Sequence, residues 1–334
     1  MTRRREFVCV LAGMLWLPAA GIAQAQPPRR RKRVAVCEQL PLNAMQSSAA
    51  KQGYAKEFAR HGLVDGVDIE IIMLVPKAVG LEAYVETFRQ AVALPADIIV
   101  GHMTGPAAKK FVLPLVGNVP LVLFGNDDGT QDSIEMLNRR GENVTGAMYY
   151  FVEMVLKRFE LVKEMRPGAK RAALVVPQAV LPQDVLELEK RYAEDRYGAG
   201  TKGLGLEFAY IEVPQDITAE ALVRVLLAAR IDMAEISAYW PGREFWAPLA
   251  ASGIAASGVG AAKARAGALL TGYSYGWFQS AIRLAARVVR GQRAADLPVE
   301  HSTEFWFYVN LSTARTLGIT VPPSILVRAR DVFE

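Results

Sequence analysis

Residues that bind metals or form disulfides are scarce in this sequence, which has three histidines and two cysteines among 334 residues. His61, His102 and His301 show no metal-ligand spacing, and no cysteine pair accompanies them. The segment 101–110, GHMTGPAAKK, lacks the Gly-Lys-Ser/Thr ending of a phosphate-binding loop. We therefore expect no metal site, no bound cofactor and no nucleotide site of the phosphate-loop kind.

The N-terminal apolar run is too short for a membrane anchor. It covers Val8–Leu17, about half of the ~20 residues that a spanning helix needs. Arg3–Arg5 precede it, and Ala23 and Ala25 follow at the two positions where a signal peptidase requires small residues. Residues 1–25 are thus predicted to be a signal peptide for export to the periplasm. The RRREFV pattern also fits the twin-arginine route.

Cysteine usage leaves no internal disulfide in the exported chain. Cys9 lies in the apolar run with no small-residue lipobox before it, so a lipid anchor is not expected. Only Cys37 remains after cleavage, and an exported protein needs no disulfide when two domains build their own cores. We interpret Cys37 as a buried strand residue rather than a nucleophile.

A basic surface that could bind nucleic acid is also missing. The net charge is +5, of which residues 1–25 contribute +2 and the basic run at 29–33 contributes +5. The rest of the chain therefore carries −2, so the argument for phosphate binding fails. We interpret residues 26–33, QPPRRRKR, as a solvated linker after the cleavage site and expect no nucleic-acid partner.

Strand and helix patterns alternate along most of the remaining chain. This alternation predicts an α/β fold of parallel sheets with helices on both faces, and the length favours two domains. The predicted strands are 33–40, 69–75, 96–101, 119–125, 171–177, 206–214 and 233–238. The predicted helices are 44–61, 80–93, 105–117, 154–165, 184–197, 219–230 and 278–290.

The closing segment Phe307–Glu334 has the apolar pattern of a docked chain end. Val309, Ile325 and six other apolar residues are spaced for burial, whereas an unattached end is usually polar and disordered. Pro322 and Pro323 predict a rigid extended turn between its two apolar stretches.

Three segments resemble one known family. LNRRGENVTG at 137–146 resembles the L-x-R-P-G-G-N-V-T-G segment of substrate-binding proteins of the tryptophan/tyrosine-type ABC importer family. The segment 156–177 is similar to the helix and strand that follow there, and 295–334 is similar to the family's ending. The segments 258–276 and 37–42 depart from the family's pattern at the cleft, which implies that the ligand can differ.

The resemblance implies the type I periplasmic-binding fold, a clamshell of two Rossmann-like lobes with parallel sheets joined by three crossings. On this basis we expect an N-terminal lobe of residues 34–148 with 269–300. The C-terminal lobe is expected to hold residues 149–268 with 301–334, and its end would be the last crossing packed on that lobe.

The resemblance also implies a function without catalysis. It predicts a monomeric periplasmic receptor that captures a small organic ligand, amino-acid-like or a carboxylate, between its lobes and delivers it to a membrane ABC permease. An alternative from another class is a ligand-sensing periplasmic module of a membrane receptor. A DNA-binding repressor is not expected, because no helix pair is predicted before the first strand.

Candidate ligand-binding residues follow the ends of predicted strands, where parallel sheets bind their ligands. A strand-to-helix junction at Met103, Thr104 and Gly105 is a predicted carboxylate site, although Thr104 can equally be a helix cap. The family resemblance implies that the loop FGNDDG also faces the cleft, so Asp127 is a candidate partner for a ligand ammonium group, with a solvated turn carboxylate as the alternative. Tyrosines in ISAYWPG and GYSYG are candidates for stacking on an apolar or aromatic ligand, and equally for packing between the lobes. The full predicted set is Glu38, Gln39, Met103, Thr104, Gly105, Asn126, Asp127, Gln178, Ser237, Tyr239, Tyr273 and Tyr275.

A serine hydrolase is the weakest alternative. GYSYG at 272–276 matches the G-x-S-x-G nucleophile pattern. His301 is the only histidine after Ser274, and Asp296 precedes it by five residues in a proline-containing loop. This spacing makes a poor catalytic triad, so we expect no enzyme activity.

The predicted carboxylate site can be tested with Thr104→Val, which keeps the side-chain shape and removes the hydroxyl. Loss of one charge-assisted hydrogen bond should weaken binding of an acidic ligand by roughly ten- to a hundredfold in calorimetry. The melting temperature of the unliganded protein should not change. Unchanged affinity, or a clearly lower melting temperature, would show that Thr104 is a structural cap.

Overall fold

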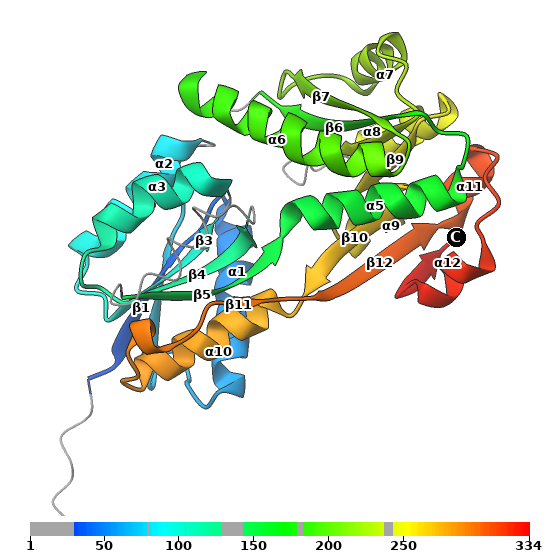
Figure 1. The fold of residues 1–334 in the computed structure, drawn as a ribbon. Coiled ribbons are helices and arrows are strands. Elements are labelled where there is room, and N and C mark those ends of the chain that lie inside the picture. Colours follow the sequence, from blue (N-terminus) through cyan, green and yellow to red (C-terminus); the bar gives the residue numbers. More distant parts are fainter. Residues whose placement is uncertain (1–29, 79, 104, 128–142, 179–182, 237–242) are drawn as a thin grey trace, which may run out of the picture. The chain divides into compact units, whose positions relative to one another are not determined.

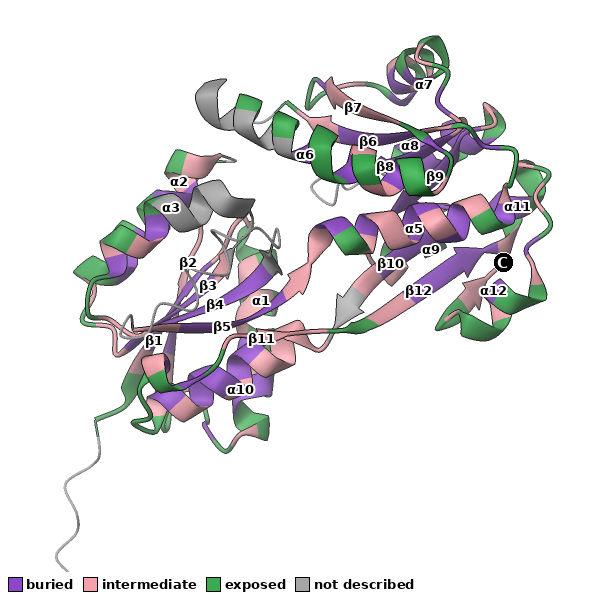
Figure 2. Ribbon diagram, in the orientation of Figure 1, coloured by how far each residue is buried: buried purple, intermediate pink, exposed green. Residues whose placement is uncertain are grey.

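The computed structural model describes residues 30–78, 80–103, 105–127, 143–178, 183–236 and 243–334. Their strands form one sheet of six strands and one of seven, with helices packed on the faces of each (Figure 1). Figure 2 shows burial concentrated along the strands and on the helix sides that face them. The predicted α/β class with two sheets is therefore confirmed.

The first sheet has the strand order β11-β5-β4-β3-β1-β2, and all its neighbouring strands are parallel. The strands are β1 (Lys32–Cys37), β2 (Ile69–Leu74), β3 (Ile98–Met103), β4 (Leu121–Asp127), β5 (Val144–Tyr150) and β11 (Glu300–His301). The chain order reverses between β1 and β3. In open parallel sheets, ligands bind beyond the carboxyl ends of the strands at such a reversal.

Both faces of the first sheet are covered by amphipathic helices. Helices α1 (Ala44–Arg60) and α10 (Trp277–Val289) pack on one face, where Phe58 and Ile282 are fully buried. Helices α2 (Leu81–Ala93) and α3 (Gly105–Val116) cover the other face, where Phe88 is fully buried. The position of α10 is notable because in the sequence it directly follows β10 (Leu270–Tyr275), a strand of the second sheet.

The second sheet has the order β13-β12-β10-β9-β8-β6-β7 and is parallel except where β10 meets β12. Its strands are β6 (Arg171–Pro177), β7 (Glu207–Val213), β8 (Met233–Ile236), β9 (Ala255–Gly258), β10 (Leu270–Tyr275), β12 (Glu304–Asn310) and β13 (Asp331–Phe333). Its helices are α5 (Phe151–Met165), α6 (Gln183–Gly203), α7 (Ala219–Ala228), α8 (Arg243–Ala251), α9 (Ala261–Arg265), α11 (Leu311–Thr316) and α12 (Pro323–Arg328).

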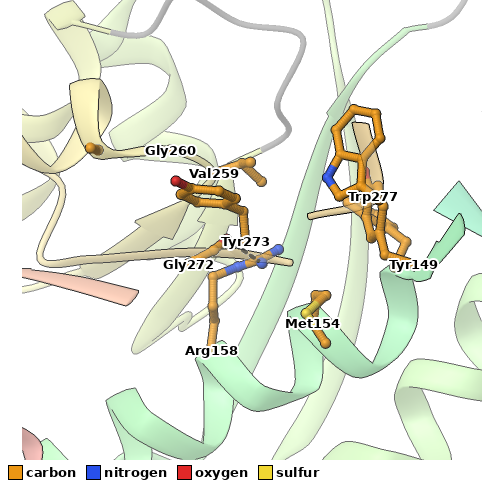
Figure 3. A pocket seen from close by; sticks show the side chains of 10 residues that line it. Tyr149, Met154, Arg158, Val259, Gly260, Gly272, Tyr273 and Trp277 are labelled. Carbon is orange, nitrogen blue, oxygen red and sulfur yellow. Dashed lines mark hydrogen bonds between the residues drawn. The ribbon is translucent and has the colours of Figure 1, made fainter. Parts of the chain in front are cut away.

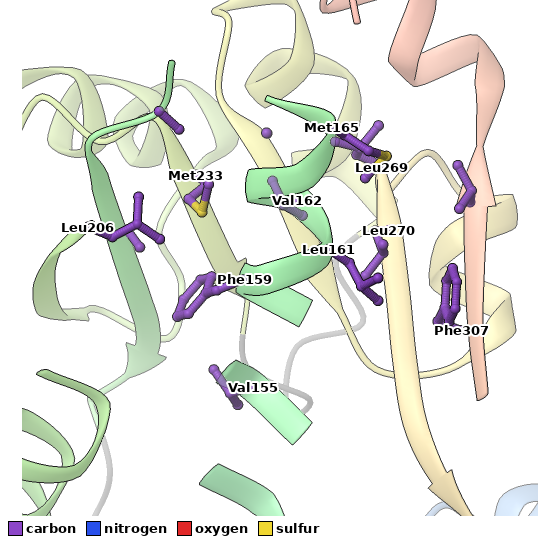
Figure 4. Close-up of a cluster of buried hydrophobic side chains, with 14 of the residues drawn as sticks. Val155, Phe159, Leu161, Val162, Met165, Leu206, Met233, Leu269, Leu270 and Phe307 are labelled. Carbon is purple, nitrogen blue, oxygen red and sulfur yellow. The ribbon is translucent and has the colours of Figure 1, made fainter. Parts of the chain in front are cut away.

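The core of the second sheet forms around α5. Phe159 and Val162 of this helix belong to one buried cluster with Met233 of β8 and Leu270 of β10 (Figure 4). On the opposite face, Leu222 of α7 and Trp246 of α8 form a separate buried cluster. Each sheet thus has apolar side chains on both faces, which explains why its central strands are almost continuously apolar.

The chain passes between the two sheets three times. It leaves the first sheet where β5 ends at Tyr150 and α5 begins, and it returns between β10 and α10. It passes to the second sheet again between β11 and β12. Three crossings are what the family resemblance implied.

Some expected lobe boundaries differ from the strand pairing. Strand β10 was assigned to the N-terminal lobe, but it pairs with β9 and β12 in the second sheet. The cause is that the crossing comes after β10, at Gly276, rather than before it. Lys32 and Arg33 were assigned to a linker, but they pair with β2 as the start of β1. Tyr150 and His301 lie in the first sheet, beyond the boundaries expected at 148 and 300.

The chain end is docked on the second sheet, as predicted. Val309 and Ile325 are fully buried, and the backbone N–H of Arg330 donates to the carbonyl of Phe307. The expected extended turn is only partly correct, because Pro323 is the first residue of α12. The fixed φ of proline and its missing N–H both suit that first helical position.

Two further expectations concern Cys37 and membrane spans. Cys37 is fully buried in β1, where burial raises the pKa of its thiol to about 12, so its interpretation as a buried strand residue is confirmed. Among the helices of the described ranges, none is both long and apolar enough to cross a membrane.

Two glycines of α6 provide a test of the packing between α5 and α6. A Cβ added at Gly200 would lie 2.4 Å from Cδ1 of Leu156, whereas a Cβ at Gly198 meets nothing within 4 Å. Gly198→Ala should stabilise the protein by about 0.5–1 kcal/mol, because alanine favours the helix. Gly200→Ala should lose this gain and destabilise by about 1–3 kcal/mol through overpacking.

Urea unfolding followed by circular dichroism measures both variants, and Gly198→Ala is the matched control within the same helix. Equal stabilisation by the two substitutions would show that α5 and α6 are packed more loosely here than the structure indicates.

Candidate functional site

The first sheet brings several predicted residues to one edge. Glu38 directly follows β1, Met103 ends β3, and Asn126 and Asp127 end β4. Because β1, β3 and β4 are adjacent and parallel, their carboxyl ends meet at the same edge of the sheet. Gly105 begins α3 beside them, and Thr104 lies outside the described residues. The predicted carboxylate site at 103–105 therefore stays a prediction.

Glu38 is a half-buried carboxyl group at this edge. Burial raises its pKa above the usual range for glutamate, and a hydrogen bond with the Tyr54 hydroxyl opposes that increase. The pKa of Tyr54 is itself raised, by burial first and by the neighbouring Glu38 carboxyl second. The backbone N–H of Glu38 donates to Leu74, which fixes the residue at the strand end. Gln39 follows it, also half-buried.

An aromatic cluster stands at the same carboxyl edge. The ring of His102 lies nearly parallel to those of Phe124 and Trp277, with centroid distances of 5.1 and 5.9 Å. Tyr149 at the end of β5 adds a ring 5.5 Å from Trp277. Burial lowers the pKa of His102 to about 4, so its imidazole is neutral near pH 7. Its environment gives His102 the role of a packed aromatic residue.

A cavity of about 280 Å³ lies next to this cluster (Figure 3). Its walls combine aromatic rings, a methionine and backbone segments with small side chains. The lining residues are Tyr149, Phe151, Met154, Arg158, Val259, Gly260, Ala261, Gly272, Tyr273 and Trp277. Tyr149 and Trp277 come from β5 and α10, which pack in the first sheet, whereas Met154 and Tyr273 come from α5 and β10. The cavity thus lies at two of the three crossings.

Arg158 is the cationic side chain in the cavity wall, and its partners are buried. Its Nε and Nη2 donate to the two carboxylate oxygens of Glu235 at 2.9 and 2.7 Å. Its Nη1 donates to the carbonyl of Gly272 at 2.8 Å, the bond drawn dashed in Figure 3. Ser257 donates to the same Glu235 carboxylate at 2.6 Å. These bonds hold the guanidinium plane in one orientation between α5, β8 and β10.

Gly272 allows a close approach at the cavity floor. A Cβ at this position would lie 2.4 Å from the ring of Phe305 on the antiparallel neighbour β12. The glycine therefore lets Phe305 cover the strand while the Gly272 carbonyl faces Arg158. Any larger residue would push apart the strand and the ring.

Lys263 of α9 adds a second cation close to the ion pair. Burial lowers the pKa of Lys263 to about 8, Glu235 of β8 opposes this shift, and Arg158 of α5 adds to it. Its ammonium also lies 6.0 Å from the ring centre of Trp246 on α8. A buried lysine beside an arginine is a place where an anion is favourable, because it offsets the excess positive charge.

The predicted site residues do not all lie at the cavity. Tyr273 lines the cavity. Gln178 follows β6, is exposed and donates from its backbone to Val213, and it is not among the lining residues. Tyr275 ends β10, and Ser237 and Tyr239 lie outside the described residues, so these three stay predictions.

Sequence reasoning missed Arg158, Glu235 and the pair Tyr149 and Trp277. Arg158 and Glu235 are 77 positions apart, so no local motif links them. A signal was nevertheless present: Arg158 interrupts the apolar stripe of its helix, and Glu235 interrupts the apolar strand MAEI. A charge placed on each of two core-facing positions indicates an internal ion pair.

The strand geometry argues against the hydrolase alternative. Ser274 is paired with Phe305 inside β10, whereas a nucleophile elbow places its serine at the strand-to-helix turn. That turn is made here by Gly276, with a φ of 91°. His301 lies in the first sheet, and its ring stacks on Tyr150 at 4.6 Å.

Comparison with solved structures shows where else this fold occurs. A conserved domain protein from Vibrio cholerae superposes with a TM-score of 0.71 and 18% identity, covering 91% of this chain and 100% of that chain. The ABC domain in complex with L-Trp from Streptococcus pneumoniae gives 0.69 and 18%, with coverage of 91% and 100%. A ligand-free substrate-binding protein from Clostridium difficile gives 0.59 and 17%, with coverage of 90% and 99%.

Searches by sequence found no matching protein-family model and no matching curated protein. The structural likeness confirms the expected fold, the two-lobe periplasmic-binding architecture with parallel sheets. Because the sequence identities are only 17–18%, the comparison supports the fold and not a shared ligand or function.

The buried position of Lys263 generates a pH prediction. Between about pH 8 and pH 10.5 the native lysine loses its proton while the unfolded lysine keeps it. The unfolded state then binds more protons, so this residue should make the free energy of unfolding rise with pH in that window. Lys263→Met should abolish this rise, measured by urea unfolding at intervals between pH 7 and pH 10.

Lys202→Met, on the exposed side of α6, is the control and should follow the wild type. If Lys263→Met and the wild type show parallel pH profiles, the ammonium of Lys263 is hydrated in solution.

Proposed function

We propose that this protein is an exported receptor that binds a small organic molecule in the cavity at the crossings and delivers it to an ABC importer in the membrane. The observation that supports the proposal most directly is the composition of the cavity wall, to which elements of both sheets contribute. A ligand held in this way can favour one relative arrangement of the lobes, because it contacts residues on either side of the crossings.

The cavity dimensions and lining support a particular ligand class. A volume of about 280 Å³ is near the lower end for small-molecule pockets, which begin at roughly 300 Å³. Four aromatic rings and Met154 offer apolar contact surfaces, and stacking on such rings contributes about 0.5–1.5 kcal/mol beyond the buried area. We therefore propose an amino-acid-like compound or a small carboxylate with an apolar or aromatic part.

Location and partner are proposed on separate grounds. The predicted signal peptide at 1–25 supports export to the periplasm. Its RRREFV segment fits the twin-arginine pattern, so we propose that route. Solved structures of this fold include solute-binding proteins of ABC transporters, one with bound allitol from Agrobacterium vitis. We propose that the protein is a monomer and that its partner is a membrane permease. The alternative partner is a sensory membrane receptor. An uptake assay with the bound compound would distinguish the two, because only a permease transports the compound.

The receptor function is tested by a thermal-shift screen of the mature chain against proteinogenic amino acids, arylacetates, benzoates, sugars and polyols. A compound present at about 100 times its dissociation constant should stabilise the protein by about 2.7 kcal/mol, which is visible as a higher melting temperature. If no compound shifts the melting temperature, the receptor proposal fails.

The role of the aromatic wall is tested on the best compound of the screen. Trp277→Ala should reduce its affinity about tenfold in calorimetry, because the ring that faces the cavity is lost. Phe111→Ala removes a partly exposed ring of α3 that does not line the cavity, so it serves as the control and should leave the affinity unchanged. Equal effects of the two substitutions would place the binding site elsewhere.

A further inference from the structure

The buried cluster of Arg158, Glu235 and Ser257 calls for an explanation beyond stability. The side chains of Arg158 and Glu235 are each 1% exposed, so both charges are removed from water. Replacing a buried ion pair by apolar residues of similar volume is often neutral or stabilising, because both charges must be removed from water. Its position in a cavity wall points to binding as the reason for the pair.

The guanidinium of Arg158 has more N–H groups than the hydrogen bonds described above use. An arginine has five N–H groups. Among the described residues, three of these donate, two to Glu235 and one to Gly272. The other two belong to Nη1 and Nη2, at the end of a side chain that lines the cavity. Buried N–H groups require acceptors, and a ligand oxygen in the cavity would supply one.

The cluster also orients these donors in advance. One carboxylate oxygen of Glu235 accepts from both Arg158 Nε and Ser257 Oγ, and the other accepts from Nη2. Two strands and a helix therefore hold the planar fork, so little rotational freedom is lost when an acceptor arrives. Arginine forks match the geometry of carboxylates better than a lysine does.

Charge in this wall favours an anionic acceptor over a neutral one. Glu235 pairs with Arg158, and the ammonium of Lys263 of α9 is a further cation close to this ion pair. The charged groups near Lys263 include Glu235 from β8 and Arg158 from α5, while Trp246 of α8 presents its ring. A carboxylate bound beside Arg158 would lie close to both cations.

We propose that Arg158 is the residue that determines specificity for an acidic group of the ligand, and that Glu235 and Ser257 are the positioning residues that hold its guanidinium. This inference rests on the proposed receptor function. It places the acidic group against α5 and β10, in contrast to the carboxylate site predicted at 103–105. The apolar part of the ligand then faces Trp277 and Tyr149.

The test compares phenylacetate with its uncharged analogue phenylacetamide in calorimetry at pH 7. The wild type should bind the acid about ten- to a hundredfold more tightly than the amide, as expected for one charge-assisted hydrogen bond. Arg158→Gln combined with Glu235→Gln removes both charges and keeps polar side chains at the two positions, so no charge is left buried alone. In this double variant the acid and the amide should bind with nearly equal affinity.

The matched control removes an ion pair of the same kind outside the cavity. Arg328 Nη2 lies 2.7 Å from Glu164 Oε2 between α12 and α5, and both side chains are partly exposed. Glu164→Gln with Arg328→Gln should keep the preference for phenylacetate. Should the first double variant unfold, Arg158→Lys gives the same comparison, because lysine keeps the charge and loses the fork; its preference for the acid should fall.

Several results would overturn the proposal. One is that the wild type binds phenylacetate and phenylacetamide with equal affinity. Another is that the preference for phenylacetate persists in both the Arg158→Gln/Glu235→Gln variant and the Arg158→Lys variant. Loss of the preference in Thr104→Val, with the Arg158 variants unaffected, would assign the acid to the other wall. Failure of phenylacetate to bind a protein that binds other compounds of the screen also contradicts it. Absence of any binding compound contradicts the receptor function instead.

Discussion

The ion pair between Arg158 and Glu235 is the constraint around which the second sheet and its cavity are organised. Both groups are nearly inaccessible to water, so each is stable there only in the presence of the other. Their bonds join α5 to β8 and, through the Gly272 carbonyl, to β10. The elements that lead into two of the three crossings are thereby fixed to one another. A binding wall built on such elements has little freedom to rearrange.

The first sheet contributes a wall of a different character. Its carboxyl edge has the rings of His102, Phe124 and Trp277 in nearly parallel planes, with Tyr149 beside them. Of these rings, Trp277 and Tyr149 line the cavity, and the neutral imidazole of His102 packs against Trp277. One wall thus offers fixed polar donors, and the other offers aromatic faces. Small-molecule sites commonly combine an apolar lining with a few oriented polar groups.

The alternating pattern was sufficient to predict the α/β class, and most helices and strands lie within a few residues of the predicted ranges. Pairing in three dimensions decided the boundaries between lobes. Strand β10 precedes a crossing in the sequence, and its place beside β9 and β12 depends on contacts with residues up to 39 positions away. Local periodicity contains no information about such partners. Pro323 likewise fits either a turn or the start of a helix until its surroundings are known.

For the site, the sequence by itself determined which strand ends would present side chains, because parallel strands and their following loops follow from local patterns. Tyr273, predicted as a stacking residue from the aromatic GYSYG segment, lines the cavity. Only the tertiary structure decided that Trp277 and Tyr149 lie together, and that Arg158 meets Glu235 across 77 positions. The physical reason is that a buried charge is tolerated only beside its partner, and folding alone brings distant partners within hydrogen-bonding distance.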